Sequence, residues 1–129
     1  MCIGRIAAAA VAALVASSAF AATGTRIEFP GPAGVRLAGE LFMPERPGRH
    51  PAVVLLHGCG GLYAKPGVLA PRHADWAERY AQWGFVALLV DSFGPRGSKA
   101  LCSTPGPERT IDPWRDRTAD AYAALDMLV

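Results

Sequence analysis

The sequence predicts an α/β protein in which an antiparallel hairpin precedes a parallel β-α-β unit. Two short apolar runs, Ala52 to Leu56 and Phe85 to Val90, read as strands buried on both faces. An amphipathic segment between them, Arg72 to Trp83, has the spacing of a helix. Two strands that are joined through a helix run parallel, so these segments predict a β-α-β unit.

Composition and charge indicate a globular protein. The 129-residue chain is 51% hydrophobic and carries 13 basic and 11 acidic side chains, a formal net charge of +2. This is the composition of one folded domain rather than of a disordered chain. The sequence contains no run of five or more basic residues, so we expect no nucleic-acid partner.

The first 21 residues have the organisation of a cleaved signal peptide. A short segment with one positive charge precedes an apolar, Ala-rich stretch, and Ala19-Phe20-Ala21 matches an A-x-A cleavage signal. The apolar stretch has about ten residues, whereas a membrane-spanning helix needs roughly 20. We therefore expect a domain over residues 22–129 that is secreted or periplasmic, with no stable membrane anchor after cleavage.

The hairpin is predicted from alternation and from turn residues. Thr25 to Phe29 and Val35 to Met43 are separated by the sequence Pro-Gly-Pro-Ala-Gly, a dense group of turn formers. The second segment alternates apolar and polar side chains with a period of two. We expect this hairpin to lie at a sheet edge with one face in solvent.

The next strand, Ala52 to Leu56, ends in the loop His57-Gly58-Cys59-Gly60-Gly61. Successive glycines permit a sharp turn and leave backbone N–H groups uncovered, so that an anion can approach them. Parallel α/β sheets bind their ligands outside the carboxyl ends of the strands. This loop is therefore the predicted ligand site.

The second half of the β-α-β unit is bounded by recognisable residues. After an irregular segment, 63–71, the helix Arg72 to Trp83 stops at Gly84, and Trp76 and Tyr80 are expected to pack within the fold. Asp91 ends the following strand, and its carboxylate is expected to cap the next loop through backbone N–H groups.

A long loop rich in Gly, Pro and Ser, 91–107, leads to a last helix. Asp112 is expected to cap this helix, with Pro113 at its first position. Two arginines and two aspartates in its first turns suggest a solvated face with local ion pairs; these residues are Arg115, Asp116, Arg117 and Asp120.

Two loops narrow the interpretation. The sequence H-G-C-G-G follows the third strand at 57–61, and V-D-S-F-G-P-R-G follows the fourth at 90–97. With the antiparallel pair placed first, this order resembles the amino-terminal portion of the α/β-hydrolase superfamily, and more narrowly its dienelactone hydrolase-like family. The resemblance covers roughly residues 26–129 and implies a partial α/β-hydrolase fold.

The resemblance implies a hydrolase that acts on an ester, a lactone or a thioester by nucleophilic acyl transfer. Two backbone N–H groups hold the oxyanion in such enzymes, and the match places the first of them at Cys59 or Gly60. It also implies that Arg96 binds a substrate carboxylate, although a structural or solvated arginine fits the sequence equally well. His57 is expected to order the loop. The implied partner is a small ester or lactone, and no cofactor is implied.

The sequence contains no G-x-[SC]-x-G elbow, the motif that carries the nucleophile at the end of a fifth strand in these enzymes. Its serines after the fourth strand, Ser92, Ser98 and Ser103, lack the flanking glycines. We therefore expect a fragment truncated before the nucleophile strand, with no nucleophile in this chain and no activity alone. Two alternatives stay open: a non-catalytic exported binding module that uses the loop as an anion cradle, and a peptidase of the same superfamily.

Cys59 permits three further interpretations. As a nucleophile it would need an oriented base, and apart from His57 the sequence offers only His50 and His73. Spacing disfavours a metal site, so none is expected. Cys59 and Cys102 both follow strands at one edge of the sheet, and an oxidising compartment would permit a disulfide between them. Paired and free thiols are both compatible with the sequence.

Overall fold

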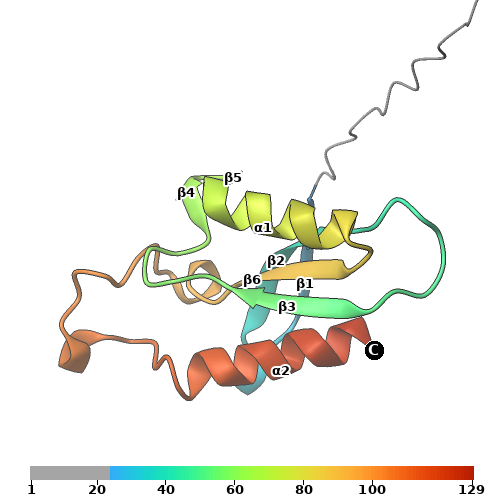
Figure 1. Ribbon diagram of the computed structural model, residues 1–129. Coiled ribbons are helices and arrows are strands. Elements are labelled where there is room, and N and C mark those ends of the chain that lie inside the picture. Colours follow the sequence, from blue (N-terminus) through green and yellow to red (C-terminus); the bar gives the residue numbers. More distant parts are fainter. Residues whose placement is uncertain (1–23) are drawn as a thin grey trace, which may run out of the picture.

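The computed structural model describes residues 24–129, so the predicted signal peptide lies outside the described residues. Figure 1 shows the main sheet between two helices, with a small two-stranded sheet near the start of the first helix. The elements in chain order are β1 (Thr25–Pro30), η1 (Pro32–Gly34), β2 (Arg36–Phe42), β3 (Ala52–Leu56), β4 (Tyr63–Lys65), β5 (Val68–Leu69), α1 (Pro71–Gln82), β6 (Val86–Asp91), η2 (Gly94–Arg96), η3 (Gly106–Glu108) and α2 (Asp116–Leu128).

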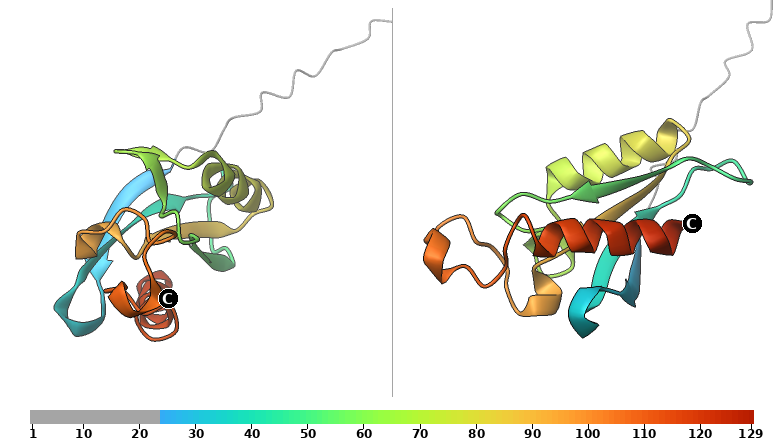
Figure 2. Two further views of the ribbon diagram at one scale, coloured as in Figure 1. Left: turned by 90° about the vertical axis from the view of Figure 1, so that its left-hand side faces the viewer. Right: turned by 90° about the horizontal axis from the view of Figure 1, so that it is seen from below.

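The main sheet confirms the predicted topology. Its strand order is β1-β2-β6-β3, with β1–β2 and β2–β6 antiparallel and β3–β6 parallel. Helix α1 covers one face and α2 covers the other, as the two views in Figure 2 show. The antiparallel hairpin and the parallel β-α-β unit therefore share one sheet.

Strand β6 lies at the centre of the core. Ala87 and Leu89 pack towards α1, whereas Leu88 and Val90 pack towards α2. All four side chains are at most 2% exposed. A strand covered on both faces needs no polar alternation, which explains the unbroken apolar run in the sequence.

The expectation that the whole hairpin lies at a sheet edge is wrong for β2. This strand pairs with β1 on one side and with β6 on the other. Leu37 and Phe42 are both buried, on opposite faces of the sheet. One face of the hairpin was expected to lie in solvent, but α1 covers the face that carries Phe42. Of the two hairpin strands, only β1 is an edge strand.

Two further boundaries differ from the sequence prediction. Segment 63–71, expected to be irregular, contains the small β4–β5 hairpin. The last helix begins at Asp116 rather than at Pro113, because a turn separates Asp112 from it. The Asp112 carboxylate caps this turn rather than the helix itself, since its Oδ1 accepts the N–H groups of Trp114 and Arg115 at 2.7 and 2.9 Å.

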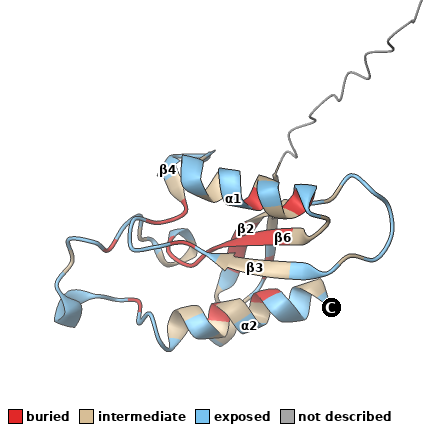
Figure 3. Ribbon diagram, in the orientation of Figure 1, coloured by how far each residue is buried: buried red, intermediate tan, exposed pale blue. Residues whose placement is uncertain are grey.

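Strand β3 forms the second edge of the sheet. It pairs with β6 on one side, and no strand among residues 24–129 pairs with its other side. Its side chains are only partly covered, as Figure 3 shows, and Leu56 is 42% exposed. The sequence predicted a fully buried strand, and the unpaired edge explains the difference. None of the helices in the described part of the chain is long and apolar enough to span a membrane.

Candidate active site

The loop after β3 presents two unpaired backbone donors. Residues 58–61 form a turn in which the Gly61 N–H donates to the Gly58 carbonyl at 3.2 Å. Gly58, Cys59 and Gly60 are exposed. Among residues 24–129, the N–H groups of Cys59 and Gly60 make no hydrogen bond. The two positions predicted as alternatives for the oxyanion donor of this loop are thus adjacent, and both N–H groups are accessible.

Carbonyl hydrogen bonds on the opposite side fix the direction of both donors. The C=O and N–H of a trans peptide point in opposite directions, and the described residues contain no cis peptide. The Gly58 carbonyl accepts the Gly61 N–H and His57 Nδ1, so the Cys59 N–H points away from them. The Cys59 carbonyl accepts the Leu101 N–H at 2.8 Å, which orients the Gly60 N–H in the same manner.

The loop is fastened to segment 99–102. A disulfide joins Cys59 to Cys102, with an S–S distance of 2.15 Å and a Cα–Cα distance of 4.8 Å. Gly61 has a φ of +84°, and a Cβ there would collide with the carbonyl oxygen of Lys99. Both the dihedral and the close approach require glycine at this position. The segment that follows β6 is therefore the support on which the loop rests.

His57 has both ring nitrogens in use. The imidazole is 1% exposed, its Nδ1 donates to the Gly58 carbonyl at 2.7 Å, and its Nε2 accepts the Ser92 N–H at 3.2 Å. Burial lowers the pKa of His57, which favours the neutral ring that these two bonds require. His57 thus ties the end of β3 to the end of β6, as expected of a residue that orders the loop.

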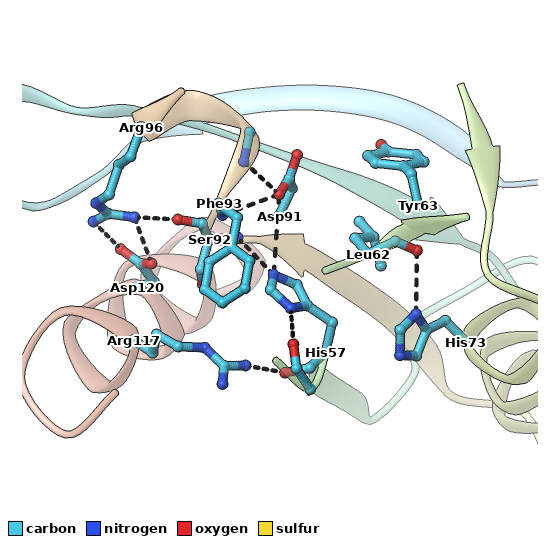
Figure 4. A network of polar contacts seen from close by, with 12 residues as sticks. His57, Leu62, Tyr63, His73, Asp91, Ser92, Phe93, Arg96, Arg117 and Asp120 are labelled. Carbon is cyan, nitrogen blue, oxygen red and sulfur yellow. Dashed lines mark hydrogen bonds and ion pairs between the residues drawn. The ribbon is translucent and has the colours of Figure 1, made fainter. Parts of the chain in front are cut away.

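A groove opens beside the same loop. It has a volume of about 560 Å³ and lies where α1 faces the outer part of β3, with Leu55, Leu56, Gly58, Gly60, His73 and Trp76 among its lining residues. This volume falls within the range of small-molecule sites. His73 is held in place because its Nδ1 donates to the Leu62 carbonyl at 3.2 Å (Figure 4).

Several solved structures have the same architecture. A hypothetical protein, PA2218 from Pseudomonas aeruginosa, matches 84% of the chain at 23% identity with a TM-score of 0.59. Brefeldin A esterase, described as a bacterial homologue of human hormone-sensitive lipase, matches 92% of the chain at 18% identity with a TM-score of 0.56. The esterase Est22 matches 84% of the chain at 16% identity with a TM-score of 0.55. The chain carries part of the α/β-hydrolase fold.

The chain spans 30% of the length of each of these three structures. No protein-family model and no curated protein matches the chain. At identities below 25%, these similarities show the fold alone.

In this α/β-hydrolase fold, Asp91 stabilises the loop that follows β6. Its Oδ1 accepts the N–H groups of Phe93 and Gly94 at 3.1 and 2.9 Å. This confirms the predicted cap. A Cβ at position 94 would collide with the Asp91 carboxylate, so the tight turn requires glycine.

Arg96 is held by an acidic residue that the sequence placed in solvent. Its guanidinium forms a two-pronged ion pair with Asp120, at 2.8 and 2.9 Å, and also donates to the Ser92 carbonyl (Figure 4). With its fork occupied in this way, Arg96 joins the β6 loop to α2. The predicted contact with a substrate carboxylate would require this ion pair to open.

The expected solvated face of the last helix is wrong for Asp120 and Arg117. Asp120 is fully buried, and Arg117 donates to the His57 carbonyl. Asp120 and Ala124 follow Arg117 by three and seven residues, which places all three on one helical face. This spacing was the available signal in the sequence. Among residues 24–129 no three His, Cys, Asp or Glu side chains come together as a metal site.

Proposed function

We propose that residues 24–129 supply the oxyanion-binding half of a hydrolase active site of the dienelactone hydrolase type. The substrate class is an ester, a lactone or a thioester, and the reaction is nucleophilic acyl transfer. The oxyanion that develops on the attacked carbonyl would accept the N–H groups of Cys59 and Gly60, which cost no reorganisation because they are already oriented.

The observation that carries this proposal is the pair of free donors at the carboxyl end of β3. Adjacent backbone N–H groups without partners, each aimed by a bonded carbonyl on the far side, form a site for a negatively charged oxygen. The neighbouring groove is lined mainly by apolar side chains, which suits an uncharged acyl group.

The nucleophile is proposed to come from chain outside residues 24–129. No strand within residues 24–129 pairs with the outer edge of β3, and the groove beside it exposes Leu55 and Leu56. A strand added at this edge in parallel would end next to the Cys59–Gly60 turn, which is where a nucleophile must stand to share its substrate with these donors. The catalytic acid and base are proposed to lie in the same additional chain.

The test is turnover of a p-nitrophenyl ester by the protein purified from its natural source. We expect ester hydrolysis and a covalent acyl-enzyme that mass spectrometry detects on a Ser or Cys outside residues 24–129. Ligand binding without turnover would favour the binding module. Faster cleavage of peptides than of esters would favour the peptidase.

Export is also part of the proposal, because residues 1–21 have the pattern of a cleavable signal and the domain contains an exposed cysteine pair. Amino-terminal sequencing of protein recovered from the periplasm or the medium should begin at Ala22. Intact protein with Met1 in the cytoplasm would contradict export.

A further inference from the structure

Arg117 carries a positive charge that has no carboxylate partner among the described residues. None of the ion pairs within residues 24–129 includes it. Asp120, three residues further along α2, uses both carboxylate oxygens on Arg96. The Arg117 side chain is half-buried, and this burial lowers its pKa. The nearby Asp120 charge opposes this shift of the Arg117 pKa, although its oxygens bond only Arg96. A partly desolvated charge without a bonded carboxylate costs free energy.

The guanidinium contacts the groups that support the loop after β3. It donates to the His57 carbonyl, and its Cζ lies 5.7 Å from the centre of the Phe93 ring (Figure 4). The same Phe93 ring meets the His57 imidazole edge-on at 4.5 Å. His57 is thus held at its carbonyl by Arg117 and at its ring by Phe93.

Orientation passes from His57 to the proposed donors through one peptide. His57 Nδ1 binds the Gly58 carbonyl, and that carbonyl belongs to the peptide whose N–H is on Cys59. A rotation of His57 would therefore turn the Cys59 N–H. We propose that Arg117 is a positioning residue for this loop: it holds the His57 carbonyl, and through His57 and Gly58 it aims the Cys59 N–H.

The effect of Arg117 on catalysis rests on the proposed function. Its effect on the orientation of the loop does not, and can be measured without turnover. The charge of Arg117 stands at the base of the loop and adds to the attraction for an anion there. A neutral side chain at position 117 would remove both the hydrogen bond to the His57 carbonyl and the positive charge. Lysine would keep the charge but lack the planar donor fork of arginine.

The experiment compares Arg117→Met, Arg117→Lys and Arg115→Met in the full chain by NMR. Arg115 is the matched control because it lies at the same helix end, is exposed and pairs with Asp116. One readout is the pKa of the His57 imidazole, which Arg117 lowers. The other is hydrogen exchange at the Gly61 N–H, which donates to the Gly58 carbonyl.

In Arg117→Met we expect a higher His57 pKa and Gly61 exchange faster by roughly tenfold or more, since the bond opens more often. Arg117→Lys should keep the low pKa because it keeps the charge, while Gly61 exchange still rises. Arg115→Met should change neither quantity. The proposal fails if Arg117→Met behaves like Arg115→Met in both readouts.

Two provisions keep the test decisive. If Arg117→Met does not fold, unchanged Gly61 exchange in Arg117→Lys would overturn the proposal. In a preparation that hydrolyses esters, Arg117→Met should lower kcat and leave KM nearly unchanged, as expected when a transition-state contact is misaligned. Absence of ester turnover in a preparation that also contains the proposed nucleophile strand would contradict the proposed function and leave the two NMR readouts valid for Arg117.

Discussion

Cys59 combines two properties that substitution can separate. Its sulfur bonds Cys102, and its N–H is a proposed oxyanion donor. Cys59→Pro removes both, whereas Cys59→Ala removes only the disulfide. Position 59 is the second residue of the 58–61 turn, a place that accepts proline. In an ester-hydrolysing preparation we expect Cys59→Pro to have a kcat about 10²- to 10³-fold below that of Cys59→Ala.

Gly60→Ala serves as a control for that comparison. A Cβ at position 60 meets no atom within 4 Å, and the substitution keeps the N–H. Turnover by Gly60→Ala should therefore stay close to that of the unmodified protein. Equal rates for Cys59→Pro and Cys59→Ala would show that the Cys59 N–H is not a donor.

His57 makes stability depend on pH. Burial lowers its pKa below 6.5 in the folded state; Arg117 also lowers it, while the Gly58 bond and Asp91 oppose the shift. Below about pH 6.5 the unfolded chain binds a proton that the folded chain excludes, so the free energy of unfolding falls as pH falls. Urea titrations at pH 7.5 and pH 5.5 should show this loss (both pH values are about one unit from the unfolded pKa).

His57→Gln isolates this contribution, because glutamine does not titrate. The variant is expected to be less stable at both pH values and to lose less stability between them. An identical pH dependence in the variant and in the unmodified protein would assign the effect to other groups.

At the scale of elements, the Arg96–Asp120 pair joins the β6 loop to α2. The Asp120 side chain is 0% exposed and that of Arg96 is 15% exposed. Arg96→Met would leave a buried carboxylate without its partner, a change that costs about 3–5 kcal/mol. Arg36 is the matched control, because it pairs with Glu28 and both side chains are exposed. Arg36→Met should lower the free energy of unfolding by at most about 1 kcal/mol.

Denaturant unfolding of both arginine variants measures these costs. A loss of less than about 1 kcal/mol in Arg96→Met would mean that Asp120 finds another donor or reaches water. That result would also reopen the question of whether the Arg96 fork can serve a ligand.

Elements with regular patterns could be predicted from the sequence, whereas contacts between elements could not. The apolar run of β6 and the amphipathic spacing of α1 follow from local periodicity, and the glycine turn after β3 from composition. The pairing of Arg96 with Asp120 joins residues 24 positions apart, which no local pattern encodes. The sequence therefore indicates the glycine turn after β3 as a candidate site, but it does not show which side chains bind one another around it.

In segment 91–107 the sequence also gave no indication of contacts between distant residues. Its Gly, Pro and Ser content predicted only a loop, yet Leu101 within it orients the Gly60 N–H through the Cys59 carbonyl. Leu101 packs with Phe93 and Ile111 in a small buried cluster. These three residues have no helical or strand period, so sequence alone carries no signal for the cluster.

For the whole molecule, the outer edge of β3 determines how residues 22–129 behave in solution. Within the described part of the chain no strand pairs with the backbone groups of this edge, and Leu56 beside it is 42% exposed. Unprotected edges of this kind pair with other chains. We expect a preparation of residues 22–129 to self-associate as its concentration rises, measured by sedimentation.

Leu56→Lys places a charge at this edge and should shift the preparation towards monomer, because an edge lysine opposes strand pairing. Met43→Lys is the control, since Met43 is similarly exposed, at 52%, but follows β2, which has partners on both sides. Association that is weakened equally by both substitutions would indicate a general effect of charge. A monomer that melts cooperatively at all concentrations would show that β3 needs no partner, and the strand proposed to carry the nucleophile would then lose its structural argument.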